Sequence, residues 1–191
     1  MWYSDRTAIT RGQSTAIIAS QQLGMWNGVA VARWIDDTRF GWPAGLATGA
    51  VLGTTAGYLV ASRPVDDGRM AAMHSGAFWG LAIGGIALGA GALDHGDDPD
   101  TIPFLAATTD LGAAALLGVG AAAGLDPEEV RVFNTGGAIG AATFFAFAGM
   151  SSGSISWSGE ALFPMAGGSA IVGGILAVGF ARQPLSSSPL S

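Results

Sequence analysis

The chain has 191 residues, of which half are apolar and only 12% are charged, against roughly 25% in an average soluble domain. The formal net charge is −6, all eight cations are arginine, and cysteine is absent. Scattered arginines on an acidic chain exclude the basic patch that nucleic acid needs. The lack of cysteine excludes disulfides, thiolate metal ligands and cysteine nucleophiles.

Residues 1–11 form a polar N-terminal segment without the apolar run of a signal peptide. Six stretches almost free of charged side chains follow, each at least 21 residues long. At 1.5 Å per helical residue, each is long enough to cross a hydrocarbon layer about 30 Å thick. The stretches are 12–32, 40–62, 70–93, 101–125, 132–159 and 161–181. Residues 184–191 are predicted to be a flexible C-terminal tail.

Glycine spacing favours helices over strands in these stretches. Glycine recurs every fourth residue at Gly41, Gly45, Gly49, Gly53 and Gly57. That spacing forms one slowly drifting stripe on a helix and lets helix backbones approach closely in a bilayer. The same i, i+4 spacing occurs at Gly24 and Gly28, Gly76 and Gly80, and Gly136 and Gly140.

The predicted fold is therefore all-α: a six-helix integral membrane bundle over residues 12–183, packed through glycine zippers. The stretch 40–62 holds few large aliphatic residues, so it would insert poorly as an isolated segment. A soluble helix, however, needs a charged face, and none of the six stretches has one. The competing interpretation is a soluble chain buried on all sides within a multi-subunit shell.

Three segments resemble one another and predict αα-hairpin repeats at about 12–64, 65–127 and 128–184. They read SQQLGMWNG, AMHSGAFWG and FNTGGAIG, and each places a polar residue two positions before a glycine pair. The polar residues are Gln22, His74 and Asn134. In each repeat a second stretch opens with an aromatic residue and a proline, as helices do in their first turn.

The arginines predict the orientation in the membrane. With six spans, the side of both termini carries Arg6, Arg11, Arg63, Arg69, Arg131 and Arg182. The opposite side carries only Arg33 and Arg39. By the positive-inside rule, both termini lie in the cytoplasm.

Asp110 is the one ionised side chain inside a predicted span, and a carboxylate there is costly unless it is paired or neutralised. One interpretation is a proton or cation site formed with Thr108 and Thr109. The other is a helix cap, in which Thr108, Thr109 and Asp110 begin a shorter helix after the segment 103–107. A third is a simple hydrogen bond between helices.

Gln22, His74 and Asn134 would lie at similar depth if the repeats are real. They could then form a polar layer that holds an ion or narrows a pore, whereas polar side chains in spans more commonly bond one helix to another. A single histidine is weak support for a metal site, so no metal ligand is predicted.

No catalytic constellation is complete in the sequence. Residues 149–153 match the pattern G-x-S-x-G, but a membrane-like helix rather than a strand precedes them, so we predict a turn. Residues 94–100 are acidic but lack the ligand spacing of a calcium loop, which favours a solvated loop. Phosphate-binding and dinucleotide-binding motifs are absent as well, so no cofactor is predicted.

We therefore expect a non-enzymatic, multi-pass membrane scaffold, or a subunit of a larger membrane assembly with homo- or hetero-oligomeric protein partners. The alternative is a small channel or transporter that uses Asp110, His74, Gln22 and Asn134. An intramembrane enzyme would need catalytic residues that the sequence does not supply.

Overall fold

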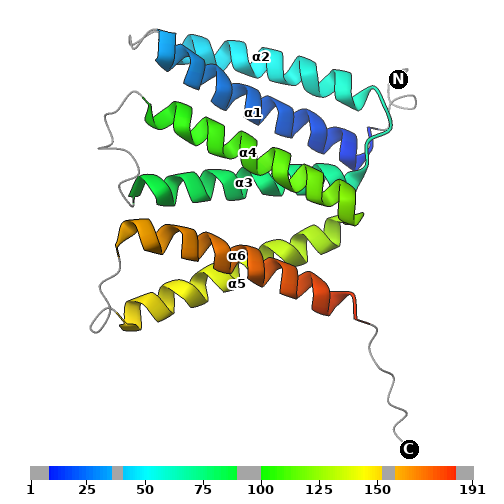
Figure 1. The fold of residues 1–191 in the computed structure, drawn as a ribbon. Coiled ribbons are helices and arrows are strands. Elements are labelled where there is room, and N and C mark those ends of the chain that lie inside the picture. Colours follow the sequence, from blue (N-terminus) through cyan, green and yellow to red (C-terminus); the bar gives the residue numbers. More distant parts are fainter. Residues whose placement is uncertain (1–8, 36–40, 90–99, 152–157, 184–191) are drawn as a thin grey trace, which may run out of the picture. The chain divides into compact units, whose positions relative to one another are not determined.

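The computed structural model describes residues 9–35, 41–89, 100–151 and 158–183, which form six helices and no strand (Figure 1). The helices are α1 (Arg11–Ile35), α2 (Gly41–Ala61), α3 (Asp67–Gly89), α4 (Thr101–Ala123), α5 (Pro127–Ser151) and α6 (Gly159–Ala181). The all-α prediction is confirmed. The predicted acidic loop lies largely outside the described residues, and so do the first eight residues, residues 152 and 153 of the predicted turn and the C-terminal tail.

The chain divides into two compact units, Met1–Pro127 with helices α1 to α4 and Glu128–Ser191 with the remaining two. In the first unit, α1 contacts all three other helices, and α3 contacts α4. Helices α1 and α2 form one antiparallel hairpin, and α3 and α4 form a second (Figure 1). The helix α1 is therefore the element that joins the two hairpins.

Proline and glycine set several helix ends. Pro127 is the first residue of α5, where its missing N–H has no helical partner to lose. Gly124 follows α4 in the left-handed conformation, with φ 61°, and its N–H donates to the carbonyl oxygen of Gly120. Pro164 differs from the prediction, because α6 begins five residues earlier at Gly159 and runs through it.

Five of the described helices, rather than the expected six, are long and apolar enough to cross a membrane. The exception is α1, although it is 25 residues long. Uncharged polar side chains lower its hydropathy, namely Gln13, Ser14, Thr15, Ser20, Gln21, Gln22 and Asn27. Because these side chains carry no charge, the absence of charge alone does not distinguish α1 from the five more apolar helices.

Small side chains are buried and large apolar side chains are exposed in these helices. The buried residues of the first unit are mainly alanines and glycines, such as Ala16, Ala19 and Ala106, each at most 2% exposed. By contrast, Leu52 and Leu59 of α2 are 64% and 68% exposed. A soluble domain buries its large aliphatic residues, whereas a membrane helix bundle can present them to lipid. The chain is therefore built as a multi-pass membrane protein.

The helices of each hairpin approach so closely that glycine is required at the contact. A Cβ built on Gly24 would lie 2.7 Å from the Cα of Gly53, and one on Gly28 would lie 2.9 Å from the Cα of Gly49. In the second hairpin, a Cβ on Gly80 would lie 3.0 Å from the Cα of Thr109. The obstructing atoms are backbone, which cannot rotate away as a side chain can.

The second unit contains the same kind of contact between α5 and α6. A Cβ on Gly140 would lie 3.3 Å from the Cα of Gly173, and one on Gly173 would lie 3.1 Å from the Cα of Gly140. Near one end of this helix pair, Phe144 and Ala148 of α5 pack against Ala166 of α6.

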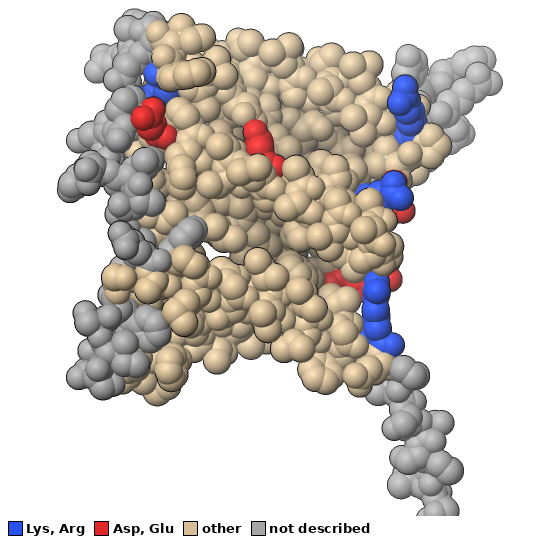
Figure 2. Space-filling model, in the orientation of Figure 1, with Lys and Arg blue, Asp and Glu red and all other residues tan. Residues whose placement is uncertain are grey.

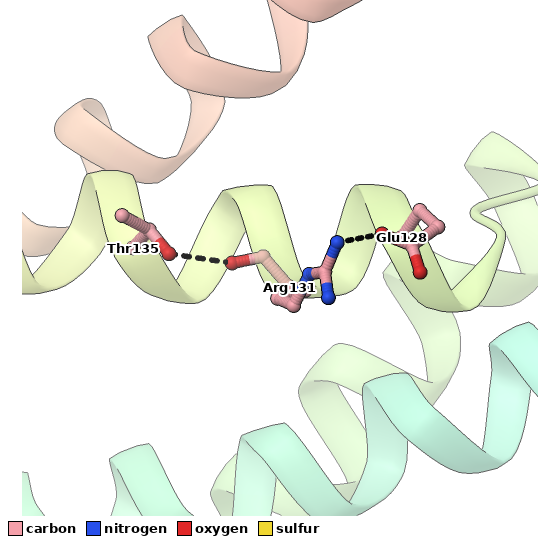
Figure 3. A network of polar contacts seen from close by, with 3 residues as sticks. All are labelled: Glu128, Arg131 and Thr135. Carbon is pink, nitrogen blue, oxygen red and sulfur yellow. Dashed lines mark hydrogen bonds and ion pairs between the residues drawn. The ribbon is translucent and has the colours of Figure 1, made fainter.

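At the other end of this helix pair, an ion pair joins the start of α5 to the end of α6. Arg182 donates from Nε to Glu129 Oε1 at 2.5 Å and from Nη2 to Oε2 at 2.9 Å. The acid lies near the start of α5 and the arginine just after α6, the placement that each helix dipole favours. Glu128 and Arg131 form a second pair within α5, and Thr135 donates to the Arg131 carbonyl oxygen (Figure 3). Both of those ionic side chains are more than 60% exposed, so that pair adds little stability.

Candidate functional site

The polar residues of α1 form one hydrogen bond to each of the other three helices in the first unit. Gln13 Nε2 donates to the carbonyl oxygen of Ala61 in α2 at 2.6 Å. Gln22 pairs with His74 of α3, and Asn27 pairs with Asp110 of α4. The residues that lower the hydropathy of α1 are thus the ones that connect it to its neighbours.

Asp110 lies inside α4, nine residues after the helix begins at Thr101. The helix-cap interpretation of Asp110 is therefore wrong. Pro103 does not delay the helix, because it occupies the third helical position, where a proline is tolerated. The hydrogen bond to Asn27 agrees instead with the third interpretation, an interhelical bond.

The Asp110 carboxylate has an uncharged partner. Asn27 Nδ2 donates to Asp110 Oδ1 at 3.0 Å and also to the Leu23 carbonyl oxygen at 3.0 Å. Between the charged ends of the four helices in this unit, Asp110 is the only described aspartate, glutamate or arginine. On the face shown in Figure 2, charged side chains lie near helix ends, apart from one acidic side chain among uncharged residues. One neutral hydrogen bond compensates a carboxylate in hydrocarbon only in part.

Thr109 is only 3% exposed, and its hydroxyl donates to the Leu105 carbonyl oxygen at 2.6 Å. The Thr108 hydroxyl donates to the same oxygen at 3.0 Å. Both hydroxyl protons are therefore used within α4, a common arrangement for threonine in a membrane helix. Thr109 keeps its oxygen lone pairs, but its proton does not point toward Asp110.

Gln22 and His74 meet, with 3.1 Å between Gln22 Oε1 and His74 Nε2. Because a carboxamide oxygen only accepts, the histidine proton lies on Nε2 when this bond forms. Both side chains are exposed to the outside of the helix pair. Asn134 belongs to α5 in the second unit, so a polar layer of all three residues stays a prediction.

The structure thus places Gln22, His74 and Asp110, three of the predicted polar residues, in two separate pairs. Gln22 and Asn27 are five residues apart on α1, which places them about 140° apart around the helix. Asn27 was missed as a site residue, although it directly precedes Gly28 in the first repeat segment. Gln13 was missed as well, because nothing in its local sequence indicates a partner 48 residues away.

A pocket of about 500 Å³ lies along α1 and α3 and is closed in part by α2 and α4. We call it the α1–α3 pocket. Its wall contains the Gln22–His74 pair, and most of its other lining residues are apolar. Thr109 also lines it, whereas Asp110 does not.

Among the residues that the structure describes, no three histidines or carboxylates gather to hold a metal ion. Comparisons with protein families, with characterised proteins and with solved structures find no match to this chain.

Proposed function

We propose that the protein is a non-enzymatic membrane scaffold that acts as a subunit of a larger assembly. The observation that carries this proposal is the use of α1, whose polar residues bond to α2, α3 and α4 in turn. Polar side chains that hold helices together stabilise a membrane bundle by about 1 kcal/mol each. Residues engaged in this way support a packing role.

The close helix contacts support the same proposal. We infer that Gly24, Gly28, Gly49 and Gly53 act as one glycine zipper, and that the other two hairpins repeat its design. The support is that each hairpin brings a Gly-xxx-Gly pair of its first helix against small residues of its second helix. In lipid, such contacts supply the van der Waals packing that replaces the hydrophobic effect between helices.

The assembly surface in this proposal includes the outer face of α6. A Cβ added to Gly168 or Gly179 would meet no atom within 4 Å, and both glycines are exposed. They are eleven residues apart, a spacing that returns to the same side of an α-helix. The exposed Val172 and Ile175 lie between them on that side, so the two glycines leave gaps into which side chains of another helix can fit.

Replacing Gly168 and Gly179 with leucine is expected to dissociate the assembly without unfolding the subunit. Bleaching-step counting in nanodiscs, with several protein-to-lipid ratios, measures the number of subunits. Ile175→Leu on the same helix serves as the control, since Ile175 is already large and exposed. A wild-type protein that is monomeric at every ratio would contradict the assembly proposal.

We further propose that all six helices cross the membrane with both termini in the cytoplasm. The support is the antiparallel pairing of α1 with α2, which gives the polar helix an apolar neighbour along its length. The chain has no cysteine, so single cysteines can be introduced cleanly. An impermeant thiol reagent is expected to label Ser158→Cys in intact cells and Ser62→Cys only after lysis. The reverse pattern would contradict this orientation.

A channel or transporter is the second proposal, and the mid-helix position of Asp110 favours it. A carboxylate whose partner is neutral keeps its negative charge uncompensated, so it is suited to bind a proton or a monovalent cation. If the protein conducts, purified protein in liposomes should carry ion or proton flux that the D110N substitution abolishes. Absence of flux for protons, sodium and potassium would exclude this second proposal and favour the scaffold.

A further inference from the structure

We propose that the α1–α3 pocket binds an uncharged lipid, namely a single apolar chain that ends in a hydroxyl or carbonyl oxygen. This site goes beyond the scaffold role. It requires that the first unit lie in a membrane, but it does not require an oligomer or ion flux.

The shape of the pocket follows from the parallel course of α1 and α3. Lining residues recur in successive turns of the two helices, at Gln22, Trp26 and Val29 of α1 and at His74, Phe78 and Leu81 of α3, and Gln22 meets His74. From Ala19 to Val29 the lining extends ten residues along α1, or about 15 Å. Its volume of about 500 Å³ falls within the range of small-molecule sites, about 300–1,000 Å³. The pocket is therefore an elongated space in which the Gln22–His74 pair lies nearer the Ala19 end.

The polar groups select an oxygen acceptor. When His74 Nε2 donates to Gln22 Oε1, the Gln22 amide still has two N–H donors. Among the described residues, no acceptor bonds to that amide nitrogen. In hydrocarbon an unpaired donor is costly, and a hydroxyl or carbonyl oxygen of the ligand would remove that cost. A hydroxyl could in turn donate to His74 Nδ1.

The absence of charge selects against a phospholipid. Arginine, aspartate and glutamate are not among the residues that line the pocket. A phosphate or carboxylate head would enter it without the guanidinium that usually pairs with such groups. The Gln22 position is also eleven residues from Arg11, about 16 Å along α1, and so lies deeper than a charged head group prefers.

Photolabelling of the full chain in phosphatidylcholine nanodiscs tests this site. The probe is a long-chain alcohol with a diazirine midway along its chain. We expect saturable labelling of peptides from α1 and α3, and competition by the unlabelled alcohol. Ala77→Trp fills the pocket from α3 and should lower the labelling about tenfold, which corresponds to about 1.4 kcal/mol of binding free energy. Ala56→Trp on the exposed face of α2 is the matched control and should leave it unchanged.

A comparison between an alcohol probe and an alkane probe tests the head-group specificity. Gln22→Leu should weaken labelling by the alcohol but not by an alkane probe of equal length. Labelling that spreads evenly over all exposed helix faces would overturn the site. Equal labelling by the alkane, by a diazirine fatty acid or by a diazirine phosphatidylcholine would overturn the ligand class. Competition by the unlabelled alcohol in the wild-type protein shows whether the site is specific, even if the Ala77 variant fails to fold.

Discussion

Replacing Gly49 with alanine is expected to destabilise the first hairpin more than any other single methyl group added to α2. The new Cβ would lie 2.8 Å from the carbonyl carbon of Gly24 and 3.1 Å from the Cα of Gly28, and closer still to the Gly24 carbonyl oxygen. All three atoms belong to the α1 backbone, so the two helices must separate. Overpacking of this kind costs about 1–3 kcal/mol, and Gly49→Leu should cost more.

Unfolding of the purified protein in detergent, followed by circular dichroism and by size-exclusion chromatography, measures this effect. Gly118→Ala in α4 is the matched control, because a Cβ there would meet no atom within 4 Å. That substitution should be neutral or stabilising by up to about 1 kcal/mol, the difference in helix propensity between glycine and alanine. Equal unfolding temperatures for the two variants would show that close approach of α1 and α2 is not required.

Replacing Asn27 with leucine is expected to cost about 1–3 kcal/mol, the penalty for leaving a buried or half-buried polar partner without its hydrogen bond. The partner is the Asp110 carboxylate, which would then lie within a span without the Asn27 donor. D110N should have a smaller effect, because a side-chain amide oxygen can still accept from Asn27.

With Asp110→Leu as the second single variant, the cycle is completed by the double variant, which has leucine at both Asn27 and Asp110. It should regain most of the stability lost by Asn27→Leu alone, since no unpaired polar group remains between the helices. The free energies of unfolding of the four proteins give the coupling between the two residues. Simple addition of the two single effects would mean that the hydrogen bond contributes nothing to stability.

The same cycle helps to separate structure from transport. If Asp110 serves only to hold α4 against α1, the double leucine variant should assemble normally, and its ion flux should equal that of the wild-type protein. If Asp110 carries a proton or cation, the double variant should be stable yet lose flux. Stability and flux are thus independent measurements on one set of proteins.

The sequence alone determined the helices and their approximate ends. Long stretches without charge, flanked by clusters of aspartate and arginine, indicate six helices, because a charged side chain strongly disfavours the hydrocarbon layer. Glycine spacing indicated which side of each helix allows close contact. For example, Gly24 and Gly28 lie against α2, as a local i, i+4 pattern suggests.

The tertiary structure decided which polar residues meet. Asp110 could have begun a helix, held an ion or bonded to a neighbouring helix, and its own surroundings in the sequence did not distinguish these. Its partner Asn27 lies 83 residues away. Gln22 was matched to His74 by repeat position, but the bond between them depends on the parallel course of α1 and α3.

The low hydropathy of α1 illustrates the same difference between what the sequence determines and what the tertiary structure determines. Hydropathy treats each helix alone against lipid, and by that measure α1 does not qualify as a span. In the folded chain α1 contacts three helices, and its glutamine and asparagine side chains bond to them. Glycine spacing and the absence of charge are local properties that can be read directly from the sequence. Hydrogen-bond partners and pockets arise only when helices far apart in the sequence pack together, so no local pattern specifies them.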